Sequence, residues 1–200
     1  MNTDFFRNKA KDYEAKSQRV ENVEKIAGAV TGSINFSPDM HIMDFGSGTG
    51  LLLERIAPLV KSITAVDISR SMNEQLEKKR RSLKCDLEII EMDLSDSTLN
   101  RSFDGIISSM TMHHVKDVQA MMHKFYSMLN EGGFIALADL DAEDGSFHTE
   151  DTGVFHSGFD RQEFSGFAAA SGFNKVSMIT ANTIHKSRGD FPIFLMTAHK

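Results

Sequence analysis

A glycine-rich turn with an acidic residue just before it is the stretch of this 200-residue sequence best suited to chemistry. It reads Asp44-Phe45-Gly46-Ser47-Gly48-Thr49-Gly50 and follows a short apolar run. Glycine adopts positive φ angles without strain and allows a ligand to approach bare backbone N–H groups. The carboxylate of Asp44 suits a ligand ammonium group and would repel a phosphate. The turn therefore predicts a binding site for a ligand whose near end is cationic.

The glycine spacing separates this turn from the common dinucleotide-binding loop. Its glycines stand at every second position, whereas the dinucleotide fingerprint is Gly-x-Gly-x-x-Gly with a pyrophosphate on the helix N-terminus. For the turn taken alone, a loop of the nicotinamide-dinucleotide type stays open as the alternative.

Two more acids end the next two strand candidates, Asp67 and Asp93. A carboxylate at Asp67 can accept hydrogen bonds from both hydroxyls of a ribose. The apolar Ile68 and Met72 that follow it suit the faces of a purine ring. Ligands in parallel sheets bind beyond the carboxyl ends of the strands, so acids at three successive strand ends indicate a ligand site rather than helix caps alone.

These motifs resemble those of the class I S-adenosylmethionine-dependent methyltransferases, of the small-molecule, methyltransferase-11-like type. The family's first motif is apolar-x-Asp-x-Gly-x-Gly-x-Gly, as in residues 42–50, and the match extends over residues 40–140. The resemblance implies S-adenosylmethionine as cofactor, with Asp44 at its amino-acid end and Asp93 near its adenine amino group. The expected cofactor-binding residues are Asp44, Phe45, Gly46, Ser47, Gly48, Gly50, Asp67, Ile68, Met72, Met92, Asp93, Leu94 and Ser109.

Four histidines are candidates for a general base. His113 and His114 lie in Phe103–Val115, which is similar to the family's fourth-strand motif, and His148 and His156 follow the fifth strand candidate. A neutral imidazole can take a proton near pH 7. The alternative is that these rings only pack and form hydrogen bonds within loops.

The segment 141–159 is long and irregular, and it holds five acids, two histidines and three phenylalanines. In the methyltransferase fold this segment stands over the pocket, so the resemblance implies that it forms the acceptor side of the site. Its composition suits a hydrophobic acceptor, a proton-accepting histidine or a divalent cation. Acids in a loop are usually solvated, and we assign no metal ligand.

Composition and the absence of two motifs limit the classes of acceptor molecule that the sequence predicts. The net charge of −6 does not favour binding to a negatively charged phosphate backbone, so we expect no nucleic-acid partner. Family members that methylate amide or nucleobase nitrogens often carry Asp/Asn-Pro-Pro-aromatic after the fourth strand, and Ser108–Thr111 has no proline. Cytosine-C5 methylation needs a cysteine there, but the one cysteine, Cys85, is distant in the chain. We therefore expect a small-molecule acceptor.

The chain also carries signals of location. A single cysteine can form neither an intrachain disulfide nor a cysteine metal cluster, which fits a reducing cytoplasm. The N-terminus has charges and no apolar signal core, and no stretch approaches the ~20 apolar residues of a membrane span. We expect a cytoplasmic protein without a membrane partner, as a monomer or weak homodimer.

Short apolar runs alternate with amphipathic segments, which predicts an α/β fold with a parallel sheet covered by helices on both faces. The resemblance implies that this fold is the three-layer, Rossmann-like methyltransferase sandwich. We expect a seven-stranded, mostly parallel sheet with an antiparallel C-terminal hairpin in a single domain. The domain would comprise an N-terminal helical cap (1–33), a cofactor-binding core (34–140) and a lid loop, last helix and hairpin (141–200). Strand candidates are 40–45, 62–68, 87–92, 103–109, 133–140, 176–183 and 191–198, and helix candidates are 4–30, 51–59, 70–83, 117–129 and 160–171.

The expected reaction is in-line transfer of a methyl group from a sulfonium to an O, N, S or C nucleophile. Because the sulfonium is already activated, the protein mainly supplies alignment and a dry pocket. The N-terminal helix, with Phe5, Phe6 and Tyr13, would pack over the cofactor mouth. The alternative is a non-catalytic module that binds the same cofactor to sense it or to dock a partner.

Overall fold

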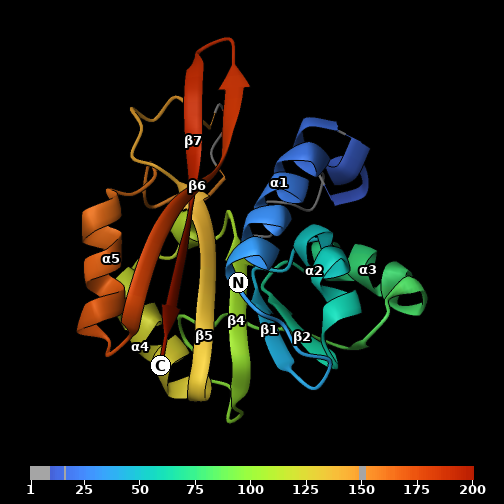
Figure 1. Cartoon of the computed structure of the whole chain (residues 1–200). Helices are drawn as coiled ribbons and strands as arrows, with labels where there is room; N and C mark the ends of the chain where they lie inside the picture. Colours follow the sequence, from blue (N-terminus) through green and yellow to red (C-terminus); the bar gives the residue numbers. More distant parts are fainter. Residues whose placement is uncertain (1–9, 16, 149–151) are drawn as a thin grey trace.

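Seven strands form one sheet with helices on both faces in the computed structural model, which describes residues 10–15, 17–148 and 152–200 (Figure 1). The strands are β1 (His41–Phe45), β2 (Ser62–Asp67), β3 (Asp86–Glu91), β4 (Phe103–Ser109), β5 (Leu129–Leu140), β6 (Asn174–Lys186) and β7 (Gly189–His199). The α-helices are α1 (Ser17–Ser33), α2 (Leu51–Ile56), α3 (Arg70–Lys79), α4 (Val118–Met128) and α5 (Arg161–Ala170). Four 3₁₀-helices are η1 (Ala10–Ala15), η2 (Ala57–Leu59), η3 (Arg80–Ser82) and η4 (Met112–His114).

The strand order is β3-β2-β1-β4-β5-β7-β6. The first five strands pair in parallel, and β7 runs antiparallel to both β5 and β6. The expected fold class, a mostly parallel seven-stranded sheet with an antiparallel C-terminal pair, is therefore confirmed.

The sheet is the middle of three layers because its strands bury both faces. In β1, Ile42 belongs to the apolar cluster formed with α1, α2 and α3, whereas Met43 belongs to the cluster formed with α4 and α5. Successive residues of a strand point to opposite faces, so neighbouring apolar residues serve two separate cores. Within the described ranges, none of the helices has both the length and the apolar character needed to cross a bilayer.

Several element ends differ from the sequence prediction. The helix expected over residues 4–30 is described as α-helix from Ser17 and continues three residues further, to Ser33. The helices expected to run to residues 59 and 83 end as α-helix at Ile56 and Lys79 and finish in 3₁₀ turns. The strand expected from residue 133 begins four residues earlier, since β5 starts at Leu129, with a register shift opposite Phe103 and Gly105. Phe5 and Phe6 lie outside the described residues.

The strands of the C-terminal hairpin are longer, and the turn between them is shorter, than the strand candidates 176–183 and 191–198 predicted. Only Ser187 and Arg188 separate β6 from β7, and the Nδ1 of His185 lies 2.6 Å from the Oδ1 of Asp190 across the strands. The tip of the hairpin projects beyond the rest of the sheet, near the N-terminal end of α1 (Figure 1). There the Gln18 side chain donates to the His185 carbonyl at 3.0 Å. The hairpin and α1 thus enclose the space above the carboxyl ends of the parallel strands.

Candidate active site

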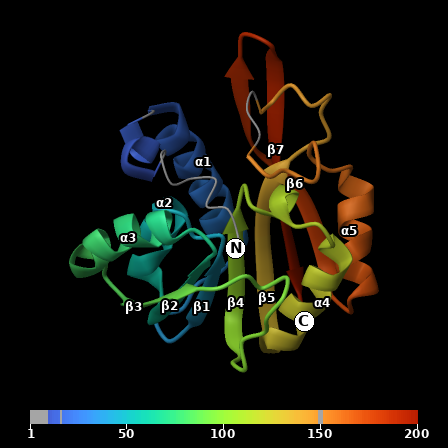
Figure 2. The ribbon, with the colours of Figure 1, turned by 180° about the vertical axis from the view of Figure 1, so that it is seen from behind.

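A cavity of about 590 Å³ lies at the carboxyl ends of β1 and β4. One wall is the glycine turn and the segment after β4, and another is α1 with Tyr13 of η1. The third wall is the segment 141–159, which we call the lid loop, together with the hairpin. The lid loop contributes Phe147, His148 and Thr152, and it lies beside the hairpin tip when the molecule is seen from behind (Figure 2). The cavity therefore joins parts of the chain that the sequence assigned to the cofactor and to the acceptor.

The glycine turn needs its glycines for backbone conformation and for space. Gly46, Gly48 and Gly50 have φ angles of 69°, 53° and 86°, which L side chains rarely adopt. A Cβ on Gly46 would overlap the Thr111 side chain, whereas a Cβ on Gly48 would meet no atom within 4 Å. Gly48 thus presents bare backbone beside the cavity that it lines.

Asp44 is the buried charge of the site. Its side chain is 2% exposed, and its Oδ2 has no hydrogen-bond partner among the described residues. Burial, and then the nearby Asp67 carboxylate, raises the pKa of Asp44 from 3.8 to about 8. The Oγ of Ser47, the Oγ1 of Thr49 and the Oγ of Ser109 are likewise buried without a partner among these residues. Such groups suit a polar ligand, and an ammonium group would satisfy the lone carboxylate oxygen.

Asp67 ends β2 beside the glycine turn. Its Oδ2 accepts a hydrogen bond from the Gly48 N–H at 2.8 Å, and its Oδ1 accepts one from the Ser69 N–H at 2.7 Å. The carboxylate therefore holds the turn as well as standing where a ribose is expected. Of the two apolar residues after it, Ile68 is 52% exposed and Met72 is buried, so Ile68 is the one that presents an open apolar face.

The residues expected around the adenine follow β3. Asp93 is half-buried, and its Oδ1 accepts from the Ser95 N–H at 2.8 Å. Met92 is half-buried and Leu94 is buried. They share the carboxyl edge of the sheet with Asp67. Like Asp67, Ile68 and Met72, they lie outside the cavity lining, so the contact of all these residues with a cofactor stays a prediction.

The remaining expected cofactor residues divide into two groups. Asp44, Gly46, Ser47, Gly48 and Ser109 line the cavity. Phe45 and Gly50 support the turn from outside the lining. Phe45 packs in the core with its ring centroid 5.2 Å from that of Phe125, and Gly50 is the N-cap of α2.

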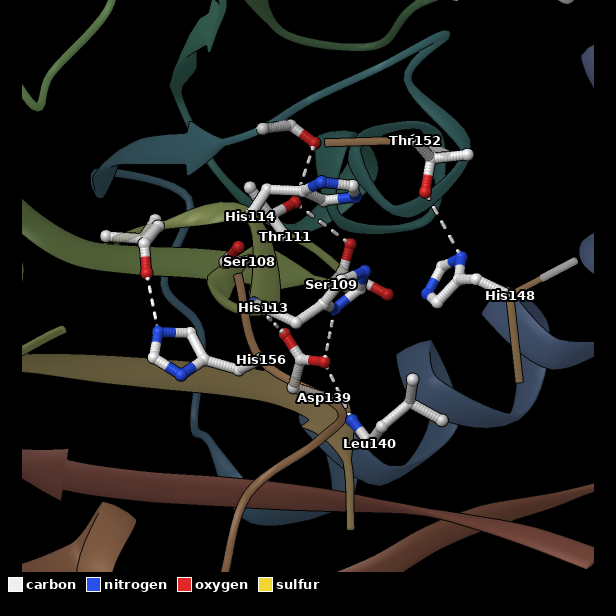
Figure 3. A network of polar contacts seen from close by, with 12 residues as sticks. Ser108, Ser109, Thr111, His113, His114, Asp139, Leu140, His148, Thr152 and His156 are labelled. Atoms are coloured by element: carbon white, nitrogen blue, oxygen red, sulfur yellow. Dashed lines mark hydrogen bonds and ion pairs between the residues drawn. The ribbon is translucent and has the colours of Figure 1, made fainter. Parts of the chain in front are cut away.

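Three of the four candidate histidines lie together at the cavity (Figure 3). The ring of His113 has its centroid 4.3 Å from that of His114 and 5.2 Å from that of His148. The Nδ1 of His113 lies 2.6 Å from the Oδ1 of Asp139, a fully buried residue of β5. Asp139 was not among the residues predicted from the sequence. The signal that could have found it is an acid near the end of the fifth parallel strand.

Burial keeps two of these histidines neutral. Desolvation, and then the neighbouring His113, lowers the pKa of His114 from 6.5 to about 4. The pKa of His148 also falls to about 4, through desolvation and then through His113, His114 and Lys186. The Nδ1 of His148 lies 3.3 Å from the Thr152 hydroxyl, and its Nε2 is buried without a partner among the described residues.

His156 lies apart from this cluster. Its Nε2 is 3.0 Å from the carbonyl oxygen of Val115 (Figure 3). Its ring packs on that of Phe159 at a centroid distance of 5.1 Å. It is absent from the cavity lining. The structure thus brings His148 and not His156 to the cavity, because His156 anchors the lid loop to the segment after η4.

The described acids of the lid loop are used by the chain itself. Asp141 forms an ion pair with Arg161 at 2.6 and 2.7 Å. Glu143 accepts from the Phe147 N–H, and Asp144 accepts from the Ser146 N–H. Over the described residues, no three His, Cys, Asp or Glu side chains are grouped so as to hold a metal ion. Glu150 and Asp151 lie outside these residues.

Several known proteins similar to this chain are named as methyltransferases. A family model described as "Methyltransferase domain" matches residues 42–133. "Uncharacterized methyltransferase C1347.09" of Schizosaccharomyces pombe is 29% identical over 76% of this chain and 57% of its own length. An "O-methyltransferase" of Pyrenophora dematioidea is 29% identical over 61% of this chain and 47% of its own length. The chain thus spans about half the length of the curated relatives that it matches.

The fold has close counterparts among solved structures. The "DhpI-SAH complex structure" has a TM-score of 0.76 with 20% identity, over 97% of this chain and 92% of that chain. Its coverage includes the lid loop and hairpin as well as the first five strands, so the whole architecture is shared. The glycine turn, the sheet and these relatives support the class I S-adenosylmethionine-dependent methyltransferase family for this chain.

Proposed function

We propose that this protein binds S-adenosylmethionine at the glycine turn and transfers its methyl group to a small molecule held under the lid loop. The observation that carries the proposal is that one continuous cavity extends from Asp44 to the three histidines and Phe147. A volume of about 590 Å³ is in the range of small-molecule sites.

The residues present fit the cofactor. A fully buried carboxylate with an unpartnered oxygen costs free energy unless a cation or donor approaches it. The α-ammonium group of S-adenosylmethionine would supply both at Asp44, and the open backbone of Gly48 leaves room beside it. Asp67 would accept from the ribose hydroxyls, and the segment from Met92 to Leu94 would meet the adenine.

The acceptor side is enclosed by parts of the chain outside the cofactor-binding core. Phe147 and His148 of the lid loop and Lys186 of β6 line it, and Lys186 donates to the Phe147 carbonyl at 2.8 Å. S-adenosylmethionine supplies an activated methyl group, so these residues act by aligning the acceptor and excluding water. The acidic net charge disfavours a nucleic-acid acceptor, and the single cysteine favours a cytoplasmic location.

A non-catalytic cofactor-binding module is the second candidate. The cavity favours an enzyme, because space continues past the glycine turn to polar side chains where an acceptor would lie. A module that only senses the cofactor has no need of that space. The relative named an O-methyltransferase favours an oxygen acceptor among the four nucleophile types.

The test is a panel of hydroxyl, amine and thiol compounds incubated with methyl-labelled S-adenosylmethionine. We expect label transfer to at least one class, and loss of transfer in Asp44→Asn. The matched variant Asp86→Asn makes the same change at the exposed start of β3 and should retain activity. Tight binding of the demethylated product without transfer to any acceptor would favour the module instead.

A further inference from the structure

We infer that Asp139 fixes the tautomer of His113, so that the Nε2 of His113 takes a proton from the acceptor during methyl transfer. The inference rests on the proposed function and narrows it. The acceptor is then a molecule whose hydroxyl or N–H group must lose a proton, and Asp139 is a positioning residue that acts through His113.

The Asp139 carboxylate is wholly enclosed and accepts three hydrogen bonds. Its Oδ1 accepts from the His113 ring at 2.6 Å and from the Leu140 N–H at 2.7 Å, and its Oδ2 accepts from the His113 N–H at 3.2 Å. Both residues are essentially unexposed, with side chains that are 2% and 0% accessible. The carboxylate thus accepts hydrogen bonds from both the ring and the backbone N–H of His113.

This arrangement decides which ring nitrogen carries the proton. A carboxylate is an acceptor only, so the Nδ1 of a neutral His113 must be its N–H, and Nε2 must be the lone-pair nitrogen. His113 lines the cavity, so this lone pair belongs to the ring that borders the acceptor space. A buried aspartate that holds an imidazole in one tautomer is the arrangement by which other enzymes prepare a histidine as a base.

The two neighbouring rings are poorer bases. The pKa of His114 and of His148 falls to about 4 by burial, so protonating either one near neutral pH is unfavourable. Their Nδ1 atoms contact the Gly153 carbonyl and the Thr152 hydroxyl, which are neutral groups. At His113 the Asp139 charge would stabilise the imidazolium that forms.

With a hydroxyl acceptor, the O–H proton moves to the Nε2 of His113 while the oxygen forms a bond to the methyl carbon. The methyl–sulfur bond breaks, and its electron pair stays on sulfur, so a sulfonium becomes a neutral thioether. His113 leaves the step as an imidazolium paired with Asp139 and later releases its proton to solvent.

The direct test is the tautomer of His113, read by ¹⁵N NMR on histidine-labelled protein without cofactor or acceptor. Wild type should show a protonated Nδ1 and an unprotonated Nε2 at pH 7–8. In Asp139→Asn, an amide replaces one acceptor oxygen with a donor, which cannot satisfy the three N–H groups together. We expect the His113 signals to shift towards the other tautomer. A wild-type His113 protonated at Nε2 would overturn the inference.

Turnover provides the second readout, with a hydroxyl acceptor found in the panel. Asp139→Asn and His113→Gln should each lower kcat about 100-fold or more while the affinity for S-adenosylhomocysteine is kept. His113→Gln leaves the Asp139–Leu140 hydrogen bond in place, so it serves if Asp139→Asn folds poorly. Unchanged kcat in a folded variant would contradict the assignment.

His185 and Asp190 provide a matched control within the same chain. Their Nδ1 and Oδ1 atoms are also 2.6 Å apart, but both side chains are about 70% exposed on the hairpin. Asp190→Asn should change neither kcat nor the His113 signals. If wild type fails to bind S-adenosylhomocysteine, the proposed function fails. If it binds and only the tautomer or kcat results disagree, the inference about Asp139 alone fails.

Discussion

At the residue scale, the charge of Asp44 has opposite effects on folding and on ligand binding. Its carboxylate is buried with one oxygen unpartnered among the described residues, so its charge opposes folding and favours a bound cation. Functional sites often concentrate such perturbed groups. The sequence predicted Asp44 because its position before the glycines is fixed locally, within one strand and one turn.

The raised pKa of Asp44 predicts a pH-dependent stability of the ligand-free protein. The folded protein holds a proton up to about pH 8, whereas the unfolded chain loses it near 3.8. The folded state binds more protons between these values, so stability should fall as pH rises through that window, by a few kcal/mol in total. Asp44→Asn should remove this slope and melt at a higher temperature than wild type at pH 8–9. Parallel pH profiles in thermal denaturation would contradict the assignment.

Asp67→Ala should affect both stability and affinity. The substitution leaves the Gly48 and Ser69 N–H groups without their acceptor, which costs roughly 1–3 kcal/mol of unfolding free energy. Nothing in the sequence indicates that the carboxylate also holds the turn. Calorimetry should show weaker binding of S-adenosylhomocysteine together with a lowered melting temperature. Unchanged affinity in the folded variant would exclude a ribose contact.

At the element scale, the structure adds most to the sequence prediction at the candidate histidines of the lid loop and of the segment after β4. The sequence offered four histidines as candidate bases, with His148 and His156 ahead of His113 and His114, but the structure separates them by the contacts that each one makes. The His113–Asp139 contact joins residues 26 positions apart, through the pairing of β4 with β5 and the turn after β4. No local pattern reports such a contact. The strands themselves could be predicted, because apolar runs and glycine turns act over a few residues.

We expect alanine variants of the two lid-loop histidines to differ in their effects on acceptor binding and on stability. His148→Ala removes a ring that lines the cavity, so the KM for the acceptor should rise while cofactor affinity stays unchanged. His156→Ala removes the contact with the Val115 carbonyl and the packing on Phe159, so the melting temperature should fall by a few degrees with little change in KM. Steady-state kinetics and thermal denaturation separate the two. A rise in KM for His156→Ala alone would reverse the assignment.

At the scale of the whole molecule, the sheet brings the glycine turn, the β4 end and the lid loop to one edge. The alternation of strands and helices was enough to predict the parallel part of the sheet, and two adjacent strand candidates without a helix between them predicted the antiparallel pair. The length of the hairpin was not predictable, because polar residues such as His185 and Asp190 pair across the strands instead of forming a loop. Its extension towards α1 is what gives the cavity its far wall.

Isothermal titration calorimetry with S-adenosylhomocysteine and with NAD tests the central claim most directly. We expect wild type to bind S-adenosylhomocysteine and to give no heat with NAD. Asp44→Asn should weaken that binding about 10- to 100-fold, the value of one charge-assisted hydrogen bond, and Asp86→Asn should leave it unchanged. Tight binding of NAD, or equal affinity for S-adenosylhomocysteine in wild type and Asp44→Asn, would contradict the account.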